Sequence, residues 1–171
     1  RACQIANLLV QAGAVPGCRV GIALSRNADL VAAVLAIWKM GGAYAPLLAH
    51  YPEQRLSYMA DIAGISHILC DENTQPQLPA TLPCKQILLT AGGDDTFREV
   101  PLKETDLAEV LFTSGSTGVP KGVTACHRSV LDYVENLCDV LKFDENSVFG
   151  NQTPLYFDAY LKEVMPTLKY G

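Results

Sequence analysis

The stretch EVLFTSGSTGVPKG, residues 109–122, constrains this chain more than any other part of its sequence. An apolar run is followed at once by three glycines, Lys121 and four hydroxyl residues, Thr113, Ser114, Ser116 and Thr117. Glycines let a backbone close around a ligand and point its N–H groups at phosphate oxygens, while hydroxyls and a lysine add further donors. The stretch therefore predicts a polyphosphate-binding loop at the end of a strand.

Two other interpretations of this loop carry less weight. A Walker A loop requires the pattern G-x-x-x-x-G-K-[ST], whereas here Pro120 precedes Lys121 and Gly122 follows it. A Ser/Gly-rich surface loop without a ligand would not be expected to combine an apolar strand before it with a Pro-Lys-Gly exit. We therefore favour phosphate binding.

The rest of the chain alternates between helical and extended patterns. Helical spacing of apolar residues occurs over residues 3–13, 27–42, 52–64 and 127–143. Strand-like runs occur over residues 19–24, 43–47, 66–71, 85–90 and 109–113, with polar loops at 72–83 and 91–106. This alternation predicts an α/β domain whose largely parallel sheet is flanked by helices.

Composition and charge exclude several classes of function. The 171 residues suffice for one compact domain with its own core. A net charge of -5 argues against a nucleic-acid partner, and no polybasic run is present to bind a membrane surface. No apolar stretch is long enough to span a bilayer, and the first residues lack the anatomy of a signal peptide.

The cysteines and histidines point to no metal or disulfide framework. None of the six cysteines forms a C-x-x-C pair, and most lie in apolar surroundings, so we expect free thiols in a reducing compartment, the cytoplasm. The three histidines are too scattered to indicate a metal site, and metal ligands stay unknown.

Three segments together resemble one enzyme family. LFTSGSTGVPKG closely resembles the signature loop of the adenylate-forming (ANL) enzymes, which include acyl- and aryl-CoA ligases, luciferases and the adenylation domains of nonribosomal peptide synthetases. The pair LAIWKMGGAYAPL and YPEQRLSYMADIAG resembles motifs of peptide-synthetase adenylation domains and of D-alanine–carrier-protein ligases. NQTPLYFDAYLKE resembles the segment in which an aromatic–Asp pair meets the amino-acid substrate.

The resemblance implies a fold, a reaction and a set of partners. Residues 1–171 are expected to be the early, N-terminal portion of an AMP-binding (adenylation) domain whose remainder is absent. In such domains ATP and an amino acid give an aminoacyl-adenylate and pyrophosphate, and the adenylate then passes to the phosphopantetheine thiol of a peptidyl carrier domain. ATP and Mg²⁺ are the implied cofactors, with Mg²⁺ sharing in the charge stabilisation.

The same resemblance assigns the phosphate-loop residues. Lys121 and Thr117 are expected to act on the reacting phosphates. The implied ATP-binding set is Thr113, Ser114, Gly115, Ser116, Thr117, Gly118 and Lys121.

The substrate-binding set implied by the resemblance is Phe157, Asp158, Ala159 and Lys162. The Asp158 carboxylate can pair with the α-ammonium of an amino acid, which fatty and aryl acids lack. Asp158 could instead cap the N-terminus of a helix. Lys162 suits an acidic side chain such as that of glutamate, because Asp-Ala-Lys resembles glutamate-selecting pockets. It could equally be a solvated surface lysine or the partner of Asp158 in an i, i+4 ion pair.

A few residues have structural expectations or depart from the family pattern. His127 could contact the nucleotide or cap the next helix, and we favour a structural role. Trp38, Tyr44 and the methionines are expected in the core. The segment APLLAH lacks the acidic residue and proline common in the family, and Tyr160 stands where a serine is usual, which could alter packing at the pocket mouth.

Four functions stay open at this point. The favoured one is a peptide-synthetase adenylation domain, and the next is a standalone ligase that loads an amino acid onto a carrier protein. An acyl- or aryl-CoA ligase is disfavoured by Asp158 and by the GGAYAPL segment. The fragment alone could also be a non-catalytic module, because in the family the ribose-binding acid, most of the pocket and a late catalytic lysine lie further along the chain.

Overall fold

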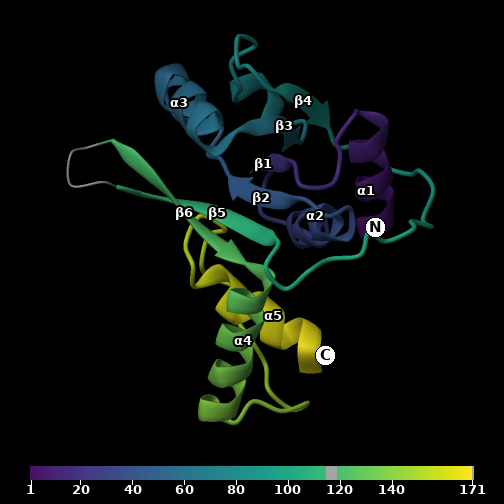
Figure 1. The fold of residues 1–171 in the computed structure, drawn as a ribbon, viewed down its shortest axis with the longest axis vertical. Coiled ribbons are helices and arrows are strands. Elements are labelled where there is room, and N and C mark those ends of the chain that lie inside the picture. Colours follow the sequence, from purple (N-terminus) through teal and green to yellow (C-terminus); the bar gives the residue numbers. More distant parts are fainter. Residues whose placement is uncertain (115–118, 171) are drawn as a thin grey trace.

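The computed structural model describes residues 1–114 and 119–170 and contains one six-stranded sheet. Its strand order is β4-β3-β1-β2-β5-β6 (Figure 1). The strands are β1 (Arg19–Ala23), β2 (Ala43–Pro46), β3 (Ile65–Cys70), β4 (Lys85–Leu88), β5 (Leu107–Ser114) and β6 (Pro120–Cys126). Strands β1 to β5 pair in parallel and β6 runs antiparallel to β5, which confirms the predicted α/β fold with a largely parallel sheet.

In the described part of the chain, five α-helices flank the sheet, and two of their ends coincide with capping residues in the sequence. The helices are α1 (Ala2–Gln11), α2 (Ala28–Lys39), α3 (Glu53–Ala63), α4 (His127–Leu141) and α5 (Tyr160–Tyr170). The side chain of Asn27 caps α2 by accepting a hydrogen bond of 2.9 Å from the backbone N–H of Asp29. Gly64 ends α3 in the left-handed region, at φ 62°, which a residue without Cβ adopts at no steric cost.

The sheet separates two hydrophobic cores. Helices α1 and α2 cover one face and α3 covers the other (Figure 1). All four residues of β2 are buried, and so are four of the five in β1. Burial on both faces explains why these strands are continuous apolar runs rather than alternating ones.

Successive strands are added to the sheet on opposite sides of β1. From β1 it passes through α2 to β2 on one side, and from β2 it passes through α3 to β3 on the other side. The carboxyl end of β1 is therefore a topological switch point, the place where open α/β sheets bind ligands. Helices α4 and α5 pack against each other below the sheet, next to β5 and β6 (Figure 1).

The sequence pattern missed one strand. Residues 120–126, which we expected to lead from the loop to the next helix, form β6, so Lys121 lies in a strand and not in a loop. Strand β6 is at the sheet edge and its four central residues, Lys121 to Thr124, are all exposed. No apolar/polar alternation could reveal it, because neither of its faces is buried in this chain.

Helix α4 was predicted correctly, but only part of its apolar surface is covered. Val130 and Val134 are buried, whereas Leu131, Val140 and Leu141 are exposed. Among the described residues, no helix has both the length and the apolar character needed to cross a membrane.

Candidate active site

The phosphate-loop prediction falls at the tip of the β5–β6 hairpin. Thr113 pairs with Lys121 across the hairpin, and Ser114 pairs with Pro120. The other predicted loop residues, Gly115, Ser116, Thr117 and Gly118, lie outside the described residues.

The described hydroxyls and the lysine of this hairpin face solvent. Thr113, Ser114 and Lys121 are all exposed. Within residues 1–114 and 119–170 their side chains make no hydrogen bond and no ion pair. The antiparallel register places Thr113 and Lys121 opposite each other on one face at this end of the strand pair, whereas Ser114, the next residue along β5, points to the other face.

The predicted substrate residues lie around the start of α5. Phe157 is 54% exposed, and the Asp158 side chain is 79% exposed. Asp158 comes two residues before α5, and among the described residues its carboxylate accepts no hydrogen bond from the first turn of that helix. The N-cap alternative for Asp158 is therefore not observed.

Lys162, in the first turn of α5, lies beside Asp158. Its Nζ is 3.9 Å from Oδ2 of Asp158 and 5.2 Å from the ring centroid of Tyr133 on α4. The i, i+4 ion pair that we weighed as an alternative is thus present in the chain without a substrate. Such an exposed pair contributes little stability, on the order of 0.5 kcal/mol.

A cavity of about 160 Å³ opens between β5, β6, α4 and α5. Asp158 lies at this cavity, together with Leu161 of α5 and Tyr133 of α4. Glu109, near the start of β5, forms another part of its lining. The structure thereby brings Asp158 next to the strand that leads into the phosphate loop. No hydrogen bond or ion pair between described residues links Asp158 directly to Thr113, Ser114 or Lys121.

Glu109 is a buried carboxylate that the sequence analysis did not single out. It is only 7% exposed, and the hydroxyl of Tyr44, itself 1% exposed, donates a hydrogen bond to it across the paired strands β2 and β5. Burial raises the pKa of Glu109, and the nearby charge of Asp158 raises it further, although the Tyr44 hydrogen bond opposes both effects. One indication of this burial was present in the sequence, because Glu109 stands directly beside the apolar residues of the run EVLF.

We predict that Glu109 makes the protein less stable as the pH rises. The pKa of Glu109 in the folded state lies above its ordinary value of 4.5. At pH values between the unfolded-state pKa and the folded-state pKa, the folded protein therefore binds more protons than the unfolded protein. Glu109→Gln removes this dependence, so the unfolding free energy of the variant minus that of wild type should become more positive as the pH rises above about 4.5. Equilibrium urea unfolding of both proteins measures the difference; a constant or shrinking difference would contradict the prediction.

His127 has a structural position, although not as a helix cap. It is the first residue of α4, after the N-cap residue Cys126, and its ring lies edge-on to Trp38 at a centroid distance of 5.5 Å. Burial lowers the pKa of His127, and among the described residues its buried Nε2 has no hydrogen-bond partner. The ring packs on Trp38 instead of capping α4, so the capping role that we favoured is not observed.

The core predictions for the aromatic, methionine and cysteine residues largely hold. Trp38 is 9% exposed and donates through Nε1 to the carbonyl of Ala108, at 2.9 Å. Met40 and Met59 are buried, whereas Met165 is partly buried. All six cysteines are free, and burial raises the pKa of the Cys70 thiol to about 11.

The comparison with protein families identifies the chain. The profile of the family described as "AMP-binding enzyme" matches residues 1–171. The chain belongs to the AMP-binding enzyme family. It is 38% identical to one subunit of the linear gramicidin synthase of Brevibacillus parabrevis over 176 aligned residues, and 33% identical to bacitracin synthase 2 of Bacillus licheniformis over 172. These alignments cover 100% and 98% of this AMP-binding chain, but only 3% and 6% of the two relatives.

Solved structures share the fold of this AMP-binding chain. The crystal structure of the nonribosomal peptide synthetase FmoA3 superposes with a TM-score of 0.86 at 26% identity, covering 99% of the chain and 18% of FmoA3. ATP-bound MatB from Rhodopseudomonas palustris superposes with a TM-score of 0.85, also at 26% identity, covering 98% of the chain and 36% of MatB. The predicted adenylate-forming fold is therefore confirmed, and the chain corresponds to less than half of either protein.

The described residues fit a magnesium ion that is held mainly by its nucleotide. Among them, no group of three or more His, Cys, Asp or Glu side chains is arranged to hold a metal. Mg²⁺ commonly keeps several waters and binds through substrate phosphates with one or two carboxylates, or with a Ser or Thr hydroxyl in phosphate-binding loops. Thr113 and Ser114 supply hydroxyls of this kind at the end of β5.

Proposed function

We propose that residues 1–171 form the N-terminal portion of an amino-acid adenylation domain of a nonribosomal peptide synthetase. The observation that carries this proposal is the position of Asp158, an exposed carboxylate on a cavity that also borders β5. The proximity of this carboxylate to β5, the strand that leads to the predicted phosphate loop, supports a role in binding an α-ammonium group. Similarity to gramicidin and bacitracin synthases supports the same interpretation.

In this proposal the chain binds and orients the two substrates for attack of the amino-acid carboxylate on the α-phosphate of ATP. Thr113, Ser114 and Lys121 donate hydrogen bonds and charge to the β- and γ-phosphates, which stabilises the pyrophosphate that leaves. Asp158 pairs with the α-ammonium and so fixes the direction of the carboxylate. A bound Mg²⁺ would neutralise part of the phosphate charge.

The side chain of the amino acid is proposed to be acidic. Lys162 lies beside Asp158 on the first turn of α5, and its ammonium group is already held near a carboxylate in the free chain. A substrate carboxylate at that position would gain a charge-assisted hydrogen bond. Glutamate is the simplest amino acid with such a group.

The carrier and the compartment are inferred from the same assignment. A peptidyl carrier domain with its phosphopantetheine thiol would accept the aminoacyl group, and the reaction would take place in the cytoplasm, as six free cysteines support. A standalone amino-acid–carrier-protein ligase would use the same residues in the same way. The downstream gene sequence distinguishes the two, because a synthetase gene continues into condensation and carrier domains whereas a ligase gene ends in a stop codon.

An amino-acid panel in the ATP–pyrophosphate exchange assay, run on the complete adenylation domain, tests the proposal. We expect exchange that depends on glutamate, and a changed preference in Lys162→Ala. Exchange with a neutral or aromatic amino acid and no effect of Lys162→Ala would refute the acidic substrate. Exchange only with fatty or aryl acids would place the domain among the CoA ligases. Residues 1–171 alone are expected to be inactive, and substantial exchange by them would contradict that expectation.

A further inference from the structure

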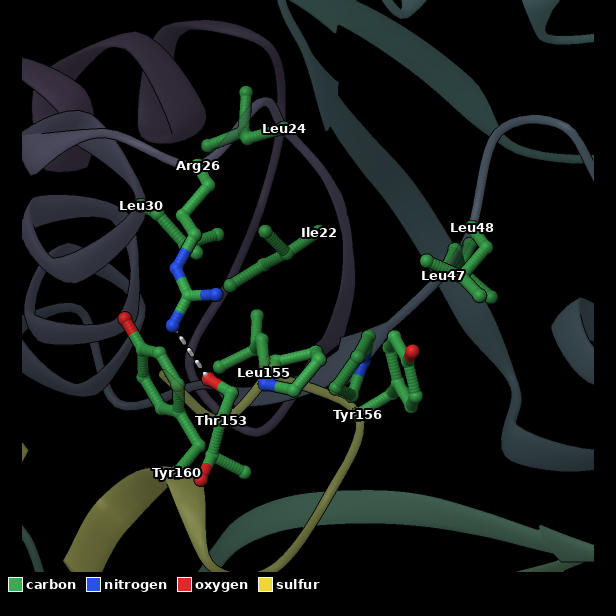
Figure 2. A pocket seen from close by; sticks show the side chains of 12 residues that line it. Ile22, Leu24, Arg26, Leu30, Leu47, Leu48, Thr153, Leu155, Tyr156 and Tyr160 are labelled. Carbon is green, nitrogen blue, oxygen red and sulfur yellow. Dashed lines mark hydrogen bonds between the residues drawn. The ribbon is translucent and has the colours of Figure 1, made fainter. Parts of the chain in front are cut away.

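The segment before Asp158 is held from one side by Arg26, which follows β1 in the connection to α2. The guanidinium group donates from Nη1 to the carbonyl of Gln152, at 2.8 Å. It also donates from Nη2 to the carbonyl of Thr153, at 3.1 Å (Figure 2). Nη2 also donates to the carbonyl and, at 3.1 Å, to the side-chain oxygen of Asn151. One side chain thus binds three consecutive residues that lie about 125 positions away in the sequence.

Glu163 holds the same segment from the other side. This residue belongs to the first turn of α5, and its Oε1 accepts a hydrogen bond of 2.6 Å from the hydroxyl of Thr153. Its Oε2 accepts from the backbone N–H of Thr153 and from the amide of Asn151, each at 3.0 Å. The Thr153 hydroxyl is the main cause of a lowered pKa of Glu163, and the charge of Arg26 contributes. The carboxylate therefore stays ionised at neutral pH.

Apolar packing alone does not determine where this segment lies. Residues 151–153 belong to no helix or strand, so sheet and helix hydrogen bonds do not orient them. The neighbouring residues Leu155 and Tyr160 are buried, but a cavity of about 160 Å³ lies between them and Ile22 and Leu30 (Figure 2). Side chains that line an open space lack packing partners on that side, so the polar contacts of Arg26 and Glu163 add a restraint that apolar packing does not supply there.

We propose that Arg26 and Glu163 are positioning residues for the amino-acid substrate. Asp158 follows closely after Thr153 in the sequence, and α5, which begins two residues after Asp158, carries Glu163. Fixing residues 151–153 against both the switch point of the sheet and α5 therefore sets where the Asp158 carboxylate stands. Neither residue touches the substrate in this scheme. The inference rests on the proposed function, because it takes Asp158 to bind the α-ammonium.

The test uses ATP–pyrophosphate exchange by the complete adenylation domain and measures KM for the amino acid and for ATP separately. For Arg26→Gln we expect the amino-acid KM to rise about tenfold to 100-fold, because small displacements of a positioning group have effects of that size. The ATP KM should change much less, because the predicted phosphate-binding residues lie on β5 and β6 and not on the segment that Arg26 holds. Arg26→Lys restores a charge but not the planar fork and should recover only part of the loss.

Arg55→Gln is the matched control, because it makes the same substitution far from the segment 151–153. Arg55 lies on α3, on the sheet face opposite to α1 and α2. Its guanidinium group stacks on Tyr51 at 4.0 Å from the ring centroid. Glu163→Gln, which keeps the shape of the side chain, provides a second variant should Arg26→Gln fold poorly, and thermal unfolding reports on folding in each case. Glu163→Gln should raise the amino-acid KM in the same selective way. The double variant should be little worse than the more severe single variant, because both residues hold one segment.

The outcomes separate this inference from the proposed function. If Asp158→Ala impairs use of the amino acid but Arg26→Gln and Glu163→Gln behave like Arg55→Gln, the positioning role is wrong and the function stands. A rise in both KM values to the same extent would also overturn it, since that indicates a general structural effect. If none of the amino acids tested supports pyrophosphate exchange by the wild-type domain, the proposed function fails and the positioning role fails with it.

Discussion

Lys121→Ala is expected to lower amino-acid-dependent pyrophosphate exchange by about 10²- to 10³-fold, the usual cost of removing one preorganised group that stabilises transition-state charge. Lys121 is exposed and pairs with Thr113 at the end of the β5–β6 hairpin, so its ammonium group is available to the phosphates. The loss should fall mainly on kcat, because the charge on the leaving pyrophosphate increases during the reaction.

Lys103→Ala provides a control for this prediction. Lys103 is also exposed, but it lies in the loop before β5, and its side chain makes no hydrogen bond or ion pair among the described residues. Its removal changes the net charge equally and should leave exchange unchanged. Equal activities of the Lys121→Ala and Lys103→Ala variants would show that Lys121 does not act on the phosphates.

Asp158→Ala is the second large effect that we expect. Losing one partner of a desolvated, hydrogen-bonded charge pair costs about 2–5 kcal/mol, so kcat/KM for the amino acid should fall by roughly 30-fold to several thousand-fold. Because Asp158 is exposed in the free chain and caps no helix among the described residues, its removal should not destabilise the fold. The KM for ATP should stay close to that of wild type.

Asp158→Asn sharpens this test. The amide keeps the size of the side chain and one hydrogen-bond acceptor but loses the charge, so most of the loss should persist if the partner is an ammonium group. A variant with wild-type affinity for the amino acid would remove Asp158 from the substrate site. Thermal unfolding of both variants serves as the control for folding.

The positions of most helices and strands could be predicted from local patterns. The runs in β1, β2 and β3 are apolar because both faces of the sheet are covered. Helix α2 begins at Asn27, whose side chain caps it, and α3 ends at Gly64. Strand β6 escaped prediction because its central residues are exposed at a sheet edge, so it forms through pairing with β5 and not through its own pattern.

For the candidate site too, contiguous motifs could be recognised in the sequence, whereas contacts between distant residues could not. The phosphate loop and the Phe157-Asp158 segment were found from contiguous motifs, in which each residue type has a chemical reason to be there. The buried pair of Tyr44 and Glu109 joins residues 65 positions apart. No local pattern predicts which buried carboxylate meets which phenol, because that depends on the order of strands in the sheet.

The sequence by itself determined the α/β class, the positions of most helices and the membership in an adenylate-forming family, because these depend on local periodicity and on contiguous residues. Only the tertiary structure decided that Lys121 lies in a strand, that Glu109 is buried against Tyr44, and that Arg26 holds the segment leading to Asp158. Each of these depends on which distant segments become neighbours. That choice follows from burying both faces of one sheet around β1, a property of the whole chain rather than of any stretch within it.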